Sequence, residues 1–233
     1  MSFPAHSHPL SGAQRRAKVH ARTLALAGII GSVGFTTLVI VQGLFLPDYS
    51  HVRMPISALA AWPTGWIQIL NFCVSGVLIV AFAIGLNMGV QPTRRGAMGV
   101  ALLVASGLGI IGAGVFSWKM IDGVPTETPS RAAAAILSFA ATGLGLIIFS
   151  RRMNADVRWR DLSTFTMIAG IVVLLLFVTV GFFAIDDGAP LHPWAGLIQR
   201  ILCAVWFTCL VVLACRLRSL ELEMAVRGVH VSS

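Results

Sequence analysis

Charged side chains are scarce in this sequence. Asp, Glu, Lys and Arg together make up 11% of the residues, whereas about a quarter of a soluble domain is charged. The hydrophobic fraction is 57% and the mean hydropathy is +0.86. These values exclude an ordinary soluble domain, and we expect much of the apolar surface to face lipid.

Cysteine is also scarce. The four cysteines lie inside apolar stretches, and no His or Cys pairs occur at the spacings of metal ligands. We therefore expect no disulfide framework, no metal site and no cofactor, and we interpret the thiols as small buried apolar groups. They are Cys73, Cys203, Cys209 and Cys215.

Motifs for nucleic acids and nucleotides are absent as well. The net charge is +8, but the basic residues sit in short loops beside apolar stretches, without a basic patch interleaved with aromatics. Nucleic acid is therefore not an expected partner. Gly107, Gly109, Gly112 and Gly114 follow no predicted strand, so they do not make a dinucleotide fingerprint. They indicate close packing of membrane helices or a local kink.

Six long apolar runs dominate the chain. The first, residues 23–46, exceeds the ~7–15 residues of a signal-peptide core, and no cleavage site of small residues follows it. At ~1.5 Å per residue it reaches ~36 Å, enough to cross a ~30 Å hydrocarbon core. We predict an all-α fold, a polytopic transmembrane helical bundle. Its six spans lie at about 23–46, 66–90, 96–118, 131–150, 162–185 and 195–217, between tails 1–22 and 218–233.

The loop charges predict an orientation for these spans. Thirteen of the 17 basic residues share one side, and five of the nine carboxylates fall on the other. By the positive-inside rule, both termini are cytoplasmic in a multi-pass protein of the cell membrane. The five carboxylates are Asp48, Asp122, Glu127, Asp186 and Asp187.

Residues 47–68, PDYSHVRMPISALAAWPTGWIQ, form the one long non-apolar segment between two spans that is not simply a basic loop. We predict a short interfacial helix over residues 53–59, with Pro55 in its first turn and the two tryptophans in the aromatic belt. Asp48 and Tyr49 are candidates for a hydrogen-bonded pair.

Arg200 lies inside the sixth span, behind Gln199, where a guanidinium is costly. One interpretation is structural, either an ion pair with Asp186, Asp187 or Asp48 or snorkelling to the head groups. The other is a fixed positive charge lining an outward-open cavity, where it holds a lipid phosphate or another anion. The candidate ligand-binding residues are Arg200, Gln199, Arg53, Tyr49, Asp48, Ser57 and Asp122.

Several stretches resemble an uncharacterised bacterial membrane family called domain of unknown function 998. They are YSHVRMPISALA, then GW, then NF…SG in the second span, and GLIQR in the sixth. The resemblance runs from the first span through the sixth. It implies a six-helix integral membrane protein and no particular activity. Its most specific positions are Tyr49, Ser50, Arg53, Ile56, Ser57, Gly76, Gly196, Gln199 and Arg200.

The chain departs from this family after the third span. Relatives tend to read Phe-Pro-Thr-Asp-Pro there, where this chain has residues 116–120, FSWKM, and a histidine early in the fourth span is replaced by alanine within 132–135. Asp122 could replace the carboxylate by a shift of register. Only His51 or His192, from other loops, could replace the histidine. The missing pair argues against catalysis.

Three functions remain open. The expected one is non-catalytic binding of a lipid head group or a membrane partner at an outward-facing polar site, with membrane lipids as partners. The second is an intramembrane enzyme on a lipid or isoprenoid-like substrate, with Asp48, Asp122 or Asp186 as the acid and Arg200 as the anion holder. The third is a small-solute transporter, although the two three-span halves show no internal similarity.

Overall fold

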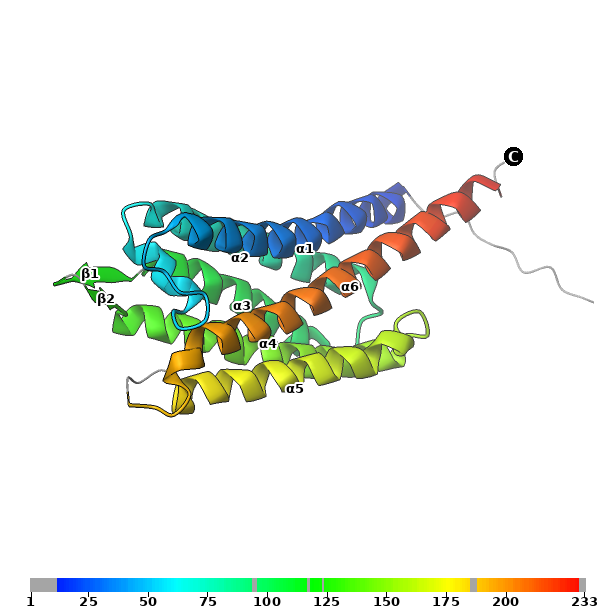
Figure 1. Cartoon of the computed structure of the whole chain (residues 1–233). Coiled ribbons are helices and arrows are strands. Elements are labelled where there is room, and N and C mark those ends of the chain that lie inside the picture. Colours follow the sequence, from blue (N-terminus) through cyan, green and yellow to red (C-terminus); the bar gives the residue numbers. More distant parts are fainter. Residues whose placement is uncertain (1–11, 94–95, 117, 123, 185–187, 231–233) are drawn as a thin grey trace, which may run out of the picture.

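Six long α-helices make up most of the protein (Figure 1). The computed structural model describes residues 12–93, 96–116, 118–122, 124–184 and 188–230. Each helix contains a stretch long and apolar enough to cross a membrane, which confirms the predicted six-span helical bundle. The helices are α1 (Gly12–Phe45), α2 (Gly65–Gly89), α3 (Gly96–Val115), α4 (Pro129–Ala155), α5 (Arg160–Phe183) and α6 (Ala195–His230).

The first and last helices extend well beyond the predicted spans. α1 begins at Gly12, inside the predicted tail 1–22, and α6 continues to His230, through most of the predicted tail 218–233. Apolar character decides which residues can lie in lipid. Polar residues such as Arg, Lys and Glu, however, form helices about as readily as Leu and Met do. In α1 and α6, the apolar run therefore marks only the part of the helix that can lie in lipid and not the polar end of the helix.

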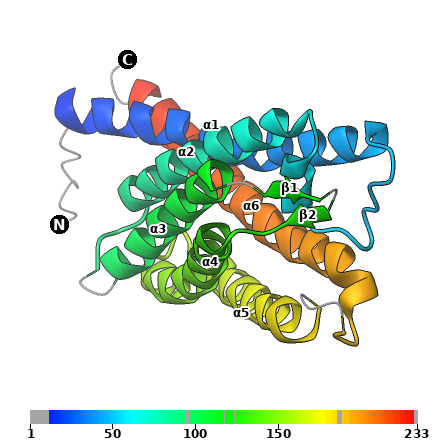
Figure 2. The same ribbon diagram turned by 90° about the vertical axis from the view of Figure 1, so that its left-hand side faces the viewer.

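The helices form a ring in which consecutive helices pack together and α6 closes the ring between α1 and α5 (Figure 2). Glycines permit the closest approaches. A Cβ on Gly76 of α2 would lie 2.6 Å from the carbonyl oxygen of Gly107 on α3. A Cβ on Gly109 would lie 2.8 Å from the backbone nitrogen of Ser138 on α4. The predicted role of the third-span glycines in close helix packing is confirmed.

A small β hairpin lies at one end of the ring, where no strand was predicted (Figure 2). β1 (Lys119–Ile121) and β2 (Val124–Thr126) pair antiparallel, with Lys119 opposite Thr126. Asp122 follows β1 with a φ of 52°, a left-handed conformation that Asp tolerates in turns. We call this end of the molecule the hairpin end and the opposite end the basic end.

The α1–α2 loop contains a buried 3-10 helix, η1 (Ile56–Ala61), in place of the interfacial helix predicted over residues 53–59. Pro55 is its N-cap and not part of its first turn. Ile56 to Ala60 are buried, and the helix packs against α1, α2, α6 and the hairpin. The segment is therefore part of the packed bundle and does not lie free on a surface.

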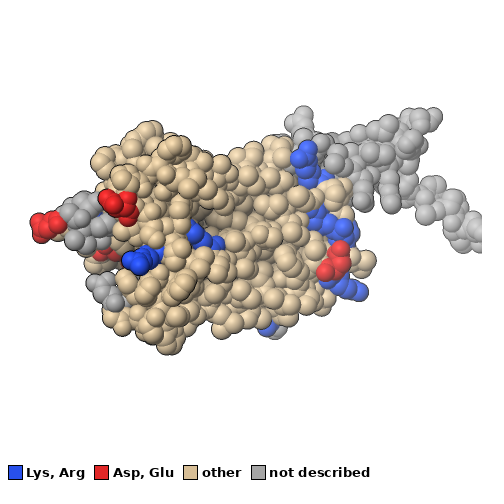
Figure 3. Space-filling view, viewed as in Figure 1, with Lys and Arg blue, Asp and Glu red and all other residues tan. Residues whose placement is uncertain are grey.

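Charge is concentrated at the two ends of the molecule (Figure 3). On the face in view, most Lys and Arg gather at the basic end and most Asp and Glu at the hairpin end. The middle is apolar on the outside as well. On α5, for example, Ile168 is 52% and Leu175 62% exposed, as expected for side chains that face lipid.

A buried arginine, Arg152, binds the end of α2 and the loop that follows it at the basic end. Arg152 is 3% exposed. Its guanidinium donates to Asn87 Oδ1 at 2.8 Å, to the Asn87 carbonyl at 2.9 Å and, through Nε, to the Gln91 carbonyl at 2.8 Å. These bonds satisfy carbonyl oxygens at the end of α2. They also show how this chain accommodates a buried guanidinium, which is by pairing it with neutral oxygens.

Candidate ligand site at the hairpin end

Arg200 fastens the α1–α2 loop to the start of α6. Its Nη1 donates to the carbonyl oxygens of Met54 at 3.0 Å and Gly196 at 2.8 Å. Its Nη2 donates to the Tyr49 hydroxyl at 2.6 Å. The Tyr49 hydroxyl in turn donates to the Pro55 carbonyl at 3.1 Å. The guanidinium thus joins two points of the loop, Met54 and Tyr49, to one turn of α6.

Two further hydrogen bonds reinforce this attachment. Leu197 N–H donates to the Val52 carbonyl at 2.9 Å, and Ile56 N–H donates to Gln199 Oε1 at 2.6 Å. We call this set of contacts between residues 49–56 and 196–200 the clasp. An amide oxygen accepts hydrogen bonds and an amide nitrogen donates them. Because the Gln199 oxygen accepts from Ile56 N–H, the Gln199 nitrogen is the end that faces other groups.

Gly196 makes the close approach of the two segments possible. A Cβ at this position would lie 2.3 Å from the Met54 carbonyl oxygen and 2.9 Å from the His51 carbonyl oxygen. Both are backbone atoms that cannot rotate away. The two stretches that most specifically resemble domain of unknown function 998 therefore meet in space. Residues from both stretches form the clasp.

The structural interpretation of Arg200 needs correction. Among the described residues its guanidinium pairs with neutral oxygens and with no carboxylate. Asp48 is exposed, with a φ of 61° that suits a turn, so the predicted ion pair with it is wrong. Asp186 and Asp187 lie outside the described residues. Arg200 also does not line the cavity described below.

The other predicted site residues do not gather at one place. Asp48, Arg53 and Asp122 are exposed, and Ser57 is buried in η1. The predicted pair between Asp48 and Tyr49 does not form, because the Tyr49 hydroxyl is engaged by Arg200 and the Pro55 carbonyl. Gln199 alone of the predicted residues both joins the clasp and lines a cavity.

Burial and the Arg200 charge change the pKa values of two side chains in the clasp, Tyr49 and His51. Burial raises the pKa of the Tyr49 hydroxyl, and the nearby Arg200 charge offsets part of that rise. Burial and the Arg200 charge both lower the pKa of the His51 imidazole. The rings meet edge to face, with centroids 5.3 Å apart. Both side chains are therefore neutral at neutral pH, and the Arg200 guanidinium is the charged partner in these hydrogen bonds.

A cavity of about 20 Å³ lies inside the ring beside the clasp. Ile56 of η1 and Gln199 of α6 form one side of it, and side chains of α1, α2, α3 and α4 complete the wall. Much of the wall is aromatic. Phe35 packs against Phe72 with centroids 5.4 Å apart and against Phe207 at 5.2 Å.

Arg131, in the first turn of α4, is the charged residue of this cavity. Arg131 is 3% exposed, and its Nε and Nη1 are buried without a hydrogen-bond partner. It forms an ion pair with Glu127, in which Nη1 and Oε1 are 3.7 Å apart, a distance too long for a hydrogen bond. The guanidinium lies over the Phe72 ring, 5.6 Å from the centroid. Since Arg does not deprotonate in proteins, the buried charge stays.

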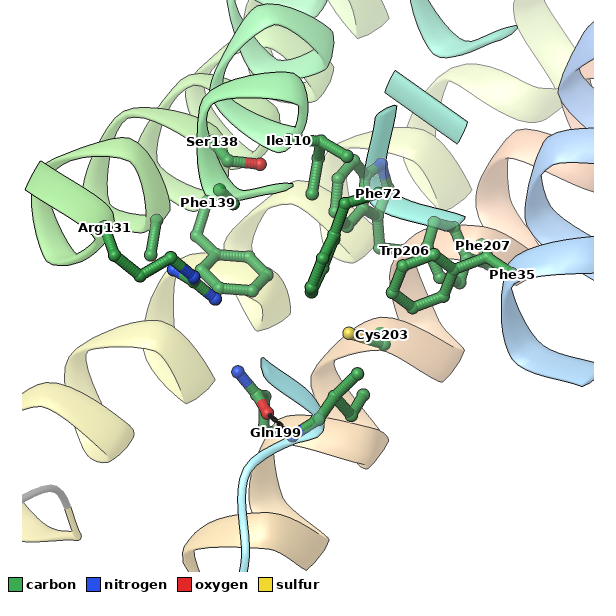
Figure 4. A pocket seen from close by; sticks show the side chains of 13 residues that line it. Phe35, Phe72, Ile110, Arg131, Ser138, Phe139, Gln199, Cys203, Trp206 and Phe207 are labelled. Atoms are coloured by element: carbon green, nitrogen blue, oxygen red, sulfur yellow. Dashed lines mark hydrogen bonds between the residues drawn. The ribbon is translucent and has the colours of Figure 1, made fainter. Parts of the chain in front are cut away.

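Arg131 and Gln199 face each other across the cavity (Figure 4). The Gln199 oxygen is taken by Ile56 N–H, so the amide nitrogen is the end available to the cavity. Ser138 Oγ and Trp206 Nε1 belong to side chains of the same wall, and both are buried without a hydrogen-bond partner. Arginine and tryptophan nitrogens only donate. The polar part of the wall therefore suits a group that accepts hydrogen bonds.

One feature of the sequence indicates that Arg131 is unusual, and a count of the charges in each loop does not capture it. A cation in the first turn of a helix lies near the positive end of the helix dipole, where it is disfavoured. Arg131 occupies this position in α4, and its own N–H is capped by Thr128 Oγ1 at 3.3 Å. A residue in so unfavourable a position needs a compensating contact.

The cysteines correct one further expectation. All four are free thiols, and Cys203 and Cys209 are buried as predicted. Cys215, however, is exposed and Cys73 only half-buried. In the described part of the chain, no group of three or more His, Cys, Asp or Glu side chains is arranged to hold a metal ion.

Comparison with known proteins identifies the family. The model of the family described as "Protein of unknown function (DUF998)" matches residues 29–216. No curated protein and no solved structure matches the chain. The matched range includes both halves of the clasp and Arg131. Because the match spans far more than half of the sequence, this protein belongs to the DUF998 family.

Proposed function

We propose that this is a multi-pass protein of the cell membrane that binds the acidic group of a lipid or lipid-like molecule between Arg131 and Gln199. Both termini would be cytoplasmic, because the positive-inside rule places the basic end there. The hairpin end and its cavity would then lie in the outer half of the membrane. The observation that carries the proposal is the buried Arg131 guanidinium in a cavity wall, whose Nε and Nη1 have no hydrogen-bond partner.

Comparison of the arginines supports this proposal. Arg152 and Arg200 each donate to several oxygens of the protein. Leaving a buried donor unsatisfied costs ~1–3 kcal/mol, and more for a charged group. Arg131 carries two such donors, and the Glu127 carboxylate stands too far away to accept from them. An acidic ligand group would supply the missing hydrogen-bond acceptors.

The same geometry favours binding over catalysis. Apart from Arg131 and Cys203, no side chain of the cavity wall is ionisable, so the cavity offers no carboxylate or imidazole for general acid–base chemistry. The proposed acids Asp48 and Asp122 are exposed in turns. Their position does not favour the enzyme alternative.

Transport is also less favoured. A transporter needs access to its site from both sides of the membrane. Toward the basic end, the ring is filled by fully buried side chains. These include Leu86, Phe149, Met153, Trp159 and Leu213.

The test is mass spectrometry of the lipids and small acids that co-purify with the full chain in mild detergent. Wild type is compared with Arg131→Gln and with the control Arg53→Gln, which removes an exposed arginine. A charge-assisted hydrogen bond contributes ~1.5–3 kcal/mol, so we expect an acidic species to fall by about 10- to 100-fold in Arg131→Gln only. Identical profiles in all three proteins would refute the proposal.

A further inference from the structure

We infer that a groove between α4 and α5 at the basic end binds the phosphate of an anionic phospholipid from the surrounding leaflet. This site lies at the opposite end of the molecule from the hairpin (Figure 1) and does not depend on Arg131. Three observations carry the inference: an exposed arginine without a partner, the hydrogen-bonding groups of the wall, and the apolar stripes that lead away from the groove.

The groove has the size and the depth of a lipid head-group site. Its volume is about 220 Å³, whereas one water needs ~10–15 Å³, so a phosphate with its glycerol has room. The fourth predicted span ends at residue 150 and the fifth begins at residue 162, which is the level at which lipid phosphates flank the hydrocarbon. The groove is lined by Ser150, Arg151 and Asn154 of α4 and by Ser163, Thr164 and Met167 of α5.

Arg151 is the cation of this groove. Its side chain is exposed and makes no hydrogen bond or ion pair with the residues that the structure describes. The nearest carboxylates along the chain are engaged elsewhere, because Asp156 pairs with Arg158 at 2.7 Å and Asp161 pairs with Arg216 at 3.3 Å. None of the six residues of the wall is acidic. The groove therefore suits a phosphate, which a guanidinium binds through two parallel hydrogen bonds, and offers no counter-charge to the amine of a zwitterionic lipid.

The rest of the polar wall offers both donors and acceptors. Asn154 and Thr164 are exposed, and within the described part of the chain their side chains have no partner. Their amide and hydroxyl groups can donate to phosphate oxygens. The serine hydroxyls donate to carbonyls of their own helices, at 2.7 Å for Ser150 and 2.9 Å for Ser163, so their oxygens remain able to accept. This combination matches a phosphate that carries hydroxyl groups, as in phosphatidylglycerol.

Exposed apolar side chains lead from the groove toward the middle of the spans. On α5, Ile171 is 41% and Leu175 62% exposed, and they follow Met167 at intervals of four residues, which keeps them on one face of the helix. On α4, Leu144 is 46% exposed and precedes Arg151 by seven residues, about two helical turns. An acyl chain along these stripes would hold the lipid whose phosphate meets the guanidinium. A free phosphate ion would gain no such contact.

The test is native mass spectrometry of the full chain in dodecyl maltoside with dioleoyl phosphatidylglycerol or dioleoyl phosphatidylcholine. Wild type is compared with Arg151→Gln and with the control Arg218→Gln, which removes an exposed arginine of α6 that does not line the groove. Loss of a charge-assisted hydrogen bond weakens binding about 10-fold or more, whereas general attraction to one surface arginine accounts for ~5-fold. The affinity for phosphatidylglycerol should therefore fall at least ~10-fold in Arg151→Gln and at most ~5-fold in Arg218→Gln.

Further variants separate this site from other effects. Because Arg151 is exposed and has no partner in the described structure, Arg151→Gln should melt within about 2 °C of wild type when no lipid is added. Thr164→Val keeps the size of the side chain and removes its hydroxyl, so the affinity should fall about 5-fold, the effect of one neutral hydrogen bond. Arg131→Gln should leave the retention of phosphatidylglycerol in this groove unchanged.

Three results would overturn the inference. Equal losses in Arg151→Gln and Arg218→Gln would mean that the basic end attracts anionic lipid without a site in the groove. Equal affinity of wild type for phosphatidylglycerol and phosphatidylcholine would exclude recognition of an anionic lipid. Displacement of phosphatidylglycerol by excess inorganic phosphate would assign the groove to a soluble anion.

Discussion

Replacing Gly196 by alanine should break hydrogen bonds of the clasp. The added Cβ would lie 2.3 Å from the Met54 carbonyl oxygen and 2.9 Å from Arg200 Nη1. The carbonyl belongs to backbone, so the loop must move away from α6. That movement breaks the bonds from Arg200 to Met54 and from Leu197 to Val52.

The cost can be estimated from these contacts. Overpacking costs ~1–3 kcal/mol, and two lost hydrogen bonds cost ~0.5–1.5 kcal/mol each. The higher helix propensity of alanine returns up to ~1 kcal/mol. The free energy of unfolding should therefore fall by about 1–6 kcal/mol, with a central value of ~3 kcal/mol. At ~2–4 °C per kcal/mol for a chain of this size, the central value lowers the melting temperature by about 6–12 °C.

The assay is thermal unfolding of the purified chain in detergent, followed by intrinsic fluorescence. Gly34→Ala is the matched control, because Gly34 also lies in a helix but has nothing within 4 Å of an added Cβ. This control should be neutral or slightly stabilising. If Gly196→Ala melts within 2 °C of Gly34→Ala, the loop is not held against α6 as described.

Two further predictions concern the clasp. Tyr49→Phe removes the acceptor that lies 2.6 Å from Arg200 Nη2, so the free energy of unfolding should fall by about 1–3 kcal/mol; an unchanged melting temperature would contradict this role. The pKa of His51 is lowered in the folded chain, so the unfolded chain binds the proton more tightly. Stability from the neutral imidazole is then present above the unfolded pKa of ~6.5 and is lost as pH falls through the folded pKa. Wild type should therefore melt at lower temperature as the pH falls below ~6.5, and His51→Gln should weaken that dependence; identical pH profiles for the two proteins would argue against it.

Much of the fold could be predicted from the sequence, because lipid imposes a simple rule on it. A run of some 20 apolar residues must be helical to satisfy its backbone, so residues 23–46 and the five later runs identified six helices. The ends of α1 and α6 escaped this rule because polar residues also form helices. The hairpin at 119–126 was missed because three-residue strands have no detectable periodicity.

The candidate site was only partly predictable. Gln199 and Arg200 stood out as polar residues within an apolar run, but the sequence could not show that Arg200 pairs with backbone carbonyls, since every residue has one. Arg131 was counted only as a charge at the start of the fourth predicted span, 131–150. Ile56 of η1 and Gln199 of α6 line the same cavity as Arg131, and the hydrogen bond between them joins residues 143 positions apart, which the sequence does not reveal.

The central claim is that the unpaired face of Arg131 is an anion-binding surface. It is tested most directly by X-ray diffraction from crystals of the full chain grown in sodium bromide, because bromide has an anomalous signal and the charge of a carboxylate. The account predicts an anomalous peak between the Arg131 guanidinium and the Gln199 amide nitrogen, absent in Arg131→Gln. A cavity without that peak, with Arg131 hydrogen-bonded to Glu127 alone, would contradict it.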